Sequence, residues 1–97
     1  MPNVDTLRPT VPVHPSRILR REMKARGWLF ADMLYRCPAM DTRHFLRLLW
    51  DKRAHLTPLD AAQLADGFGT SPEFWLNLQR QYDEAMAASE EKRQHDG

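Results

Sequence analysis

One stretch of sequence decides the fold: it begins with Thr57-Pro58-Leu59-Asp60, passes through Gly69, and continues as Ser71-Pro72-Glu73-Phe74-Trp75-Leu76-Asn77-Leu78. Thr57 and Ser71 carry hydroxyl groups that accept hydrogen bonds from the free amides of a first helical turn. A proline follows each hydroxyl residue, and proline suits the first helical position because its missing N–H would be unpaired there anyway. Gly69 suits the left-handed residue that closes a helix. The stretch therefore predicts one helix over about 58–68 and a second that begins at Pro72.

Apolar residues recur at helical spacing in both predicted helices. Thr57 and Asp60 also resemble a capping box, in which each side chain bonds the backbone amide of the other, although Asp is shorter than the usual Glu. The residues expected to face the core are Leu59, Ala62, Leu64 and Ala65, then Phe74, Trp75 and Leu78. Tyr82 and Met86 continue the last stripe beyond the reach of a short bundle, so we interpret them as candidate contacts of a homodimer or another partner.

Upstream of this stretch, the sequence predicts three shorter helices. A proline starts the first and Gly27 ends it, Pro38 stops the second, and Asp41 or Thr42 caps the third. Their expected bounds are about His14–Ala25, Phe30–Arg36 and Thr42–Trp50. Their expected inward residues are Ile18, Leu19, Met23, Met33, Leu34, Leu46, Leu49 and Trp50. Since no strand pattern or internal repeat is found, the predicted fold class is all-α with five helices.

The 97 residues fit one small domain with less regular ends. Residues 1–13 contain three prolines and no helical or alternating period, which predicts a flexible, disordered N-terminal arm. Residues 14–88 form the predicted helical domain. Residues 89–97 are almost entirely polar, and we expect a frayed tail there.

Composition excludes several classes of protein. The single cysteine, Cys37, excludes an internal disulfide. No apolar run approaches the roughly 20 residues that span a bilayer, and the first residues lack the basic and apolar blocks of a signal peptide. We therefore expect a soluble cytoplasmic protein without a membrane partner.

The sequence also predicts neither a cofactor nor an enzyme. The four histidines lack metal-ligand spacing, so no metal site is expected among His14, His44, His55 and His95. Cys37 and His44 could in principle form a nucleophile and base, but seven residues across a predicted turn do not imply hydrogen-bond contact. The chain has no glycine-rich phosphate loop, because Gly67-Phe68-Gly69 reads as the end of a helix.

Charge is distributed unevenly along the chain, although the net charge is only +1. The segment from Arg8 to Arg53 holds eleven Arg and Lys against four acids, whereas the segment from Ala54 onward holds three against eight. Such asymmetry indicates that the first half faces a polyanion and that the second faces something else, unless the unevenness is incidental. The basic residues of the first helix are interpreted as solvent or partner contacts; they are Arg17, Arg20, Arg21 and Lys24.

The third predicted helix and the loop after it carry the residue types that contact DNA. Arg43 and Arg47 are one helical turn apart and can point together into a groove, where arginine donates two hydrogen bonds to guanine. His44 can contact a nucleobase or a phosphate. The basic side chains of the loop can contact successive phosphates of the DNA backbone. The candidate DNA-binding residues are Thr42, Arg43, His44, Arg47, Lys52, Arg53 and His55. The alternative is a solvated helix face with incidental arginines.

The chain resembles the HigA-type antitoxins, a branch of the lambda-repressor-like helix-turn-helix proteins. The resemblance covers residues 14–86 and is carried by His14-Pro15, Arg26-Gly27-Trp28, Leu56-Thr57-Pro58 and the block from Phe68 to Tyr82. It implies a five-helix DNA-binding domain whose third helix enters the major groove. It also implies a dimer that represses its own operon and neutralises a cognate toxin, expected to be a RelE-like mRNA endonuclease.

The segment between the second and third helices departs from the family pattern. The usual turn glycine is absent, Pro38 occupies the end of the second helix, and Asp51-Lys52-Arg53 replaces the usual Asn-Gly-Lys. Two alternatives therefore remain: an interaction module of the same fold that has lost DNA binding, and a transcription regulator that acts without a toxin.

Overall fold

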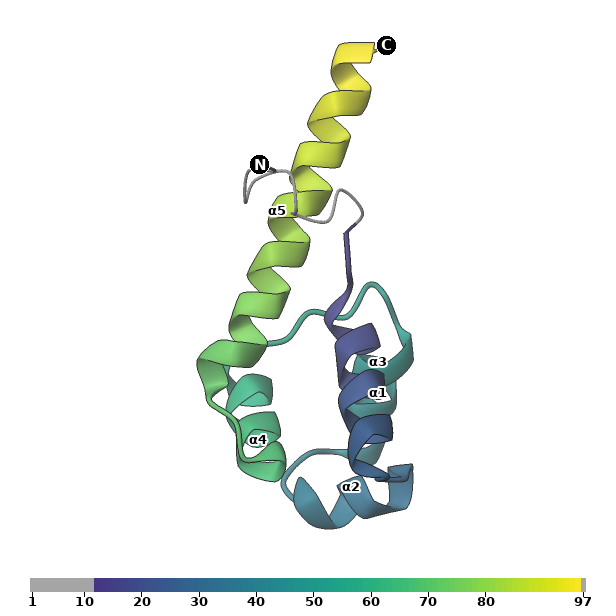
Figure 1. Cartoon of the computed structure of the whole chain (residues 1–97), viewed down its shortest axis with the longest axis vertical. Coiled ribbons are helices and arrows are strands. Elements are labelled where there is room, and N and C mark those ends of the chain that lie inside the picture. Colours follow the sequence, from purple (N-terminus) through teal and green to yellow (C-terminus); the bar gives the residue numbers. More distant parts are fainter. Residues whose placement is uncertain (1–11, 97) are drawn as a thin grey trace, which may run out of the picture.

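The computed structural model describes residues 12–96, with side chains up to Glu90, and forms five α-helices (Figure 1). They are α1 (Pro15–Arg26), α2 (Phe30–Arg36), α3 (Thr42–Trp50), α4 (Pro58–Phe68) and α5 (Pro72–Asp96). Residues 12–96 contain no strand, so the predicted all-α class with five helices is confirmed. The predicted arm lies outside the described residues except for Pro12 and Val13, which precede α1.

Capping residues and a glycine in the sequence produce the observed ends of α4 and the start of α5. The amide of Asp60 donates to Oγ1 of Thr57, and the amide of Thr57 donates to Oδ2 of Asp60, both at 3.1 Å, which completes the capping box of α4. Oγ of Ser71 accepts from the amide of Phe74 at 3.3 Å at the start of α5. Gly69 closes α4 at φ 71°, a left-handed conformation that a side chain would strain.

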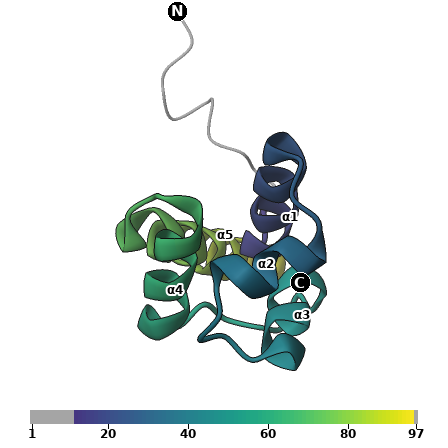
Figure 2. The same cartoon turned by 90° about the horizontal axis from the view of Figure 1, so that it is seen from below.

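The core is centred on Trp75, whose side chain is only 1% exposed. Its ring contacts that of Phe68 at a centroid distance of 5.2 Å, and its Nε1 donates to Oγ1 of Thr70 at 2.8 Å. Seen from below, α2 crosses the end of the bundle, with α4 on one side and α1 and α3 on the other (Figure 2). The largest fully buried side chains come from all five helices and are Trp75, Phe45, Leu19, Met33 and Leu64.

The inward face of α3 differs from the prediction. Leu46 and Trp50, expected in the core, are 43% and 67% exposed. Their places are taken by Phe45 and Leu48, which are buried beside Leu49. Both sets of residues follow the i, i+3, i+4 spacing of one helical stripe, so periodicity alone could not choose between them.

Further inward assignments were wrong in α2, α4 and α5. Leu59 is 67% exposed, because burial of the capping residue Asp60 turns the preceding position outward. The buried face of α4 consists of Asp60, Ala61, Leu64, Ala65 and Phe68, and Ala62 is exposed. Leu34 in α2 and Phe74 in α5 are also exposed, although Phe74 still packs edge-on against Trp75 at 5.0 Å.

The last helix, α5, projects well beyond the other four (Figure 1). It continues through Asp96, so residues 89–96, assigned from the sequence to a polar tail, extend the same helix. Their fraying stays a prediction. Within the described part of the chain, every helix is too short or too polar to cross a bilayer.

His14 joins three segments that are distant in the sequence. Its Nδ1 accepts a hydrogen bond from the amide of Ser16 at 3.1 Å, and its Nε2 donates to the carbonyl of Ala54 at 2.9 Å. The ring of Tyr82 packs edge-on against it at a centroid distance of 4.8 Å. Burial lowers the pKa of His14 below the ordinary 6.5, and the charges of His55 and Arg20 act in the same direction against the bond to Ala54.

This lowered pKa predicts a loss of stability in mild acid. Below pH 6.5 the unfolded chain binds more protons than the folded chain, so the stability present above that pH falls as His14 is forced to charge. The urea midpoint of the wild-type protein should therefore fall between about pH 7.5 and pH 5.5. In His14→Asn, which keeps an N-cap acceptor, the midpoint should be lower at neutral pH and should change less over this range. Equal pH slopes in the two proteins would contradict the assignment.

Candidate nucleic-acid interface

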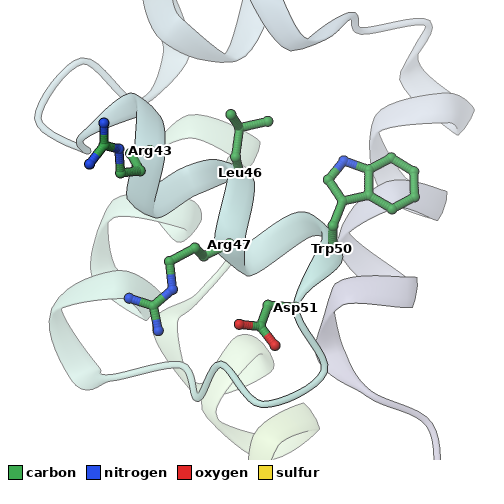
Figure 3. A pocket seen from close by; sticks show the side chains of 5 residues that line it. All are labelled: Arg43, Leu46, Arg47, Trp50 and Asp51. Carbon is green, nitrogen blue, oxygen red and sulfur yellow. The ribbon is translucent and has the colours of Figure 1, made fainter.

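The exposed face of α3 carries two arginines and two large apolar side chains. Arg43, Leu46, Arg47 and Trp50 follow the spacing of one helical face and, with Asp51, line a shallow open depression (Figure 3). Arg43 and Arg47 extend from the same side of α3 (Figure 3). In the described part of the chain, no carboxylate forms an ion pair with either guanidinium. Both are therefore available to an external anion.

Two inward contacts fix the rotation of α3. Nε2 of His44 donates to Oδ1 of Asp60 at 2.8 Å, and the ring of Phe45 packs against that of Phe30 at a centroid distance of 5.8 Å. Asp60 is 4% exposed and belongs to the capping box of α4. His44 was predicted to contact DNA, but the structure turns its Nε2 to α4 and away from the outer face.

Arg20 of α1 secures the other end of α3. Its guanidinium donates to the carbonyl of Leu49, one of the last carbonyls of the helix, and lies 4.6 Å from the centre of the Trp50 ring. A cation at this position complements the negative end of the helix dipole. The sequence interpretation placed Arg20 among solvent or partner contacts, so this positioning role was missed.

The loop after α3 divides the remaining candidate residues. Lys52 is exposed, and the side chain of Arg53 is 92% exposed beside Asp51. The hydrogen bond from the amide of Arg53 lowers the pKa of Asp51, assisted by the side chain of Arg53 and by the charge of Arg47. The basic side chains of Lys52 and Arg53 therefore stay next to the outer face of α3.

His55 instead turns toward α5. Its Nδ1 accepts from Nε2 of the buried Gln79 at 2.9 Å, and the same amide group donates to Asp83 at 3.0 Å. Oε1 of Gln79 accepts from the amide of Leu56 at 2.9 Å. Sequence reasoning did not identify Gln79, because a single polar residue within a helical stripe gives no signal of its buried partners.

The structure therefore separates the predicted DNA-binding residues into two groups. Thr42, Arg43, Arg47, Lys52 and Arg53 are exposed on α3 and its following loop. His44 is bonded to α4, and His55 is bonded to α5 although its side chain is 66% exposed. Leu46 and Trp50 join the exposed group although they were assigned to the core. The missed signal is that five of the six residues from 45 to 50 are apolar, more than one buried stripe can hold.

A second cationic surface lies on α1. It is a groove lined by Val13, Arg17, Ile18, Arg20, Arg21 and Lys24. The candidate dimer contacts lie elsewhere, on α5: Tyr82 is half-buried against His14, and Met86, one turn further, is 37% exposed.

The features of a catalytic or metal site do not converge in the described residues. Cys37 is buried and its Sγ donates to the carbonyl of Gln63 at 3.5 Å, while burial, followed by the charge of Asp66, raises its pKa and favours the thiol. A Cβ added to Gly67 would lie 2.6 Å from this sulfur, so α2 and α4 approach closely there. Over the described residues, no group of three or more His, Cys, Asp or Glu could hold a metal ion.

Comparison with known proteins identifies the family. No protein-family model and no curated protein matches the chain. The solved structure of an addiction module antidote protein of the HigA family from Coxiella burnetii is similar, with 34% sequence identity and a TM-score of 0.73. The similarity covers 88% of this chain and 91% of that chain. It confirms the resemblance drawn from the sequence, and the chain belongs to the HigA family of addiction module antidote proteins.

Proposed function

We propose that this protein is the antitoxin of a toxin–antitoxin pair that binds its cognate toxin and represses its own operon as a DNA-bound homodimer. Membership of the HigA family supports the antitoxin role, because the similar protein is an addiction module antidote. The expected toxin is a RelE-like mRNA endonuclease. An inhibitor that acts by binding needs no catalytic group of its own.

DNA binding is supported by the arginines of α3. Arg43 and Arg47 lie on one exposed face without ion-pair partners among the described residues, and Lys52 and Arg53 continue the positive charge into the loop. Guanidinium groups bond guanine edges in the major groove, and loop cations bond phosphates. In this arrangement α2 and α3 form the helix-turn-helix, and α3 enters the groove.

A homodimer would place two such helices on two half-sites about one helical turn apart. The exposed part of α5 around Met86 is our candidate for the interface of this homodimer, because it projects beyond the other helices and carries an apolar side chain at its surface (Figure 1). The half-buried side chain of Tyr82, one helical turn earlier, can extend this interface.

The toxin is proposed to bind at a second basic surface, on α1. The cationic groove on α1 is separate from the proposed DNA surface on α3 and from the proposed dimer interface around Met86. Residues 1–13 precede this groove in the sequence. An arm without a helical pattern can fold onto a partner when it binds.

One observation favours the alternative of an interaction module without DNA binding. Leu46 and Trp50 are exposed on α3, and apolar side chains of this size are common in protein interfaces. Salt dependence separates the two functions, because a protein that contacts several phosphates loses orders of magnitude in DNA affinity as salt rises. A small basic protein encoded beside this gene would distinguish the antitoxin from a regulator that acts without a toxin.

Replacing Arg43 or Arg47 by Ala should weaken binding to the DNA upstream of the protein's own gene about tenfold or more. Fluorescence anisotropy at fixed salt measures this affinity. Arg80→Ala is the matched control, because it removes the same charge from an exposed position on α5 and should leave the affinity unchanged. The variant that carries both Arg43→Ala and Arg47→Ala should still rescue growth when it is co-expressed with the toxin. Such a rescue would show that the loss of DNA affinity is not caused by unfolding. Unchanged DNA affinity in both arginine variants would end the repressor proposal.

Met86→Glu should convert the homodimer to a monomer, because each copy would bring a charge into an apolar interface. Sedimentation velocity measures the mass of the free protein. Ala88→Glu places the same charge at an exposed position of α5 on another face of the helix and should leave the dimer intact. A Met86→Glu protein that remains dimeric would place the interface elsewhere.

A further inference from the structure

The depression on α3 combines an apolar surface with two cations. Leu46 projects from the middle of the exposed face, Arg43 and Arg47 lie on one side of it, and Trp50 lies on the other (Figure 3). The apolar side chains are held outward by the inward contacts of His44 and Phe45. A ligand at this position would meet the apolar side chains of Leu46 and Trp50 beside the hydrogen-bond donors of the two arginines.

The position of Trp50 is also fixed. The guanidinium of Arg20 lies 4.6 Å from the centre of its ring and donates to the preceding carbonyl, that of Leu49. Asp51 closes the depression, and its carboxylate accepts a hydrogen bond from the amide of Arg53 at 2.9 Å, with the guanidinium of Arg53 close by. The negative charge at this end is therefore partly compensated, and the two arginines determine the sign of the surface.

A thymine in the major groove matches these features. It presents a C5-methyl group at the groove edge, and an adjacent guanine presents the two acceptors that arginine bonds. We propose that Leu46, beside Trp50, contacts the methyl group of a thymine next to a guanine bonded by Arg43 or Arg47. This inference rests on the proposed DNA binding and adds to it a residue that determines operator specificity. A protein partner would also cover Leu46, but the guanidiniums of Arg43 and Arg47, which have no ion-pair partner among the described residues, favour a polyanion.

The proposal is tested with operator duplexes in which single thymines are replaced by deoxyuridine, which removes only the C5-methyl group. A footprint on the DNA upstream of the gene first defines the bound thymines. For the wild-type protein, one deoxyuridine in a single half-site should weaken binding about fourfold, the effect of losing one buried methyl contact. Leu46→Ala should bind thymine and deoxyuridine duplexes equally at that position.

Leu59→Ala is the matched control, since Leu59 is also a surface leucine, 67% exposed against 43% for Leu46, but lies on α4; this variant should keep the fourfold penalty. Thermal unfolding of all three proteins confirms that they are folded. A deoxyuridine penalty that persists in Leu46→Ala, or a footprint in which no thymine methyl matters, overturns the methyl contact while DNA binding stands. A wild-type protein that leaves no footprint overturns the proposed function itself, and the contact with it.

Discussion

One buried carboxylate, that of Asp60 in α4, positions α3, the helix that carries the proposed DNA-binding arginines. Its Oδ2 accepts from the amide of Thr57 and starts α4, while its Oδ1 accepts from His44 of α3. Burying a carboxylate is costly unless its oxygens are bonded, and here each oxygen has a donor. Because the carboxylate can bond His44 only when that residue faces α4, the capping of one helix sets the rotation of the other. This rotation places Arg43 and Arg47 on the exposed face of α3.

The rest of the fold preserves this geometry with contacts between distant segments. Arg20 bonds the last turn of α3, His14 bonds Ala54 in the loop that follows, and Gln79 bonds Leu56 at the end of the same loop. Arg20 lies on α1, His14 caps the start of α1 and Gln79 lies on α5, so α1 and α5 together position α3 and its loop. The aromatic contacts around Trp75 place α4 and α5 together and provide the base for this arrangement.

Helix positions could be predicted from sequence because their signals are local. The prolines, Gly27, Gly69 and Thr57 act within a few residues of a helix end, and the observed ends of α1 and α4 agree with them, whereas α5 continues through the predicted tail. The inward faces could not be predicted in the same way. In α3, Phe45 with Leu48 and Leu46 with Leu49 satisfy the same helical spacing, and the choice depends on the long-range bond from His44 to Asp60. For this reason the sequence did not reveal that His44 bonds α4 or that Leu46 lies on the exposed face of α3.

The most direct measurement is a double-mutant cycle in operator affinity with His44→Ala, Asp60→Ala and the double variant, at a temperature where all remain folded. If the bond orients α3, Asp60→Ala should weaken binding about fivefold although Asp60 is buried on α4, and the double variant should lose little more than either single variant. If His44 touches DNA directly, only His44→Ala should weaken binding. Unchanged affinity in Asp60→Ala, or losses that add in the double variant, would contradict the account.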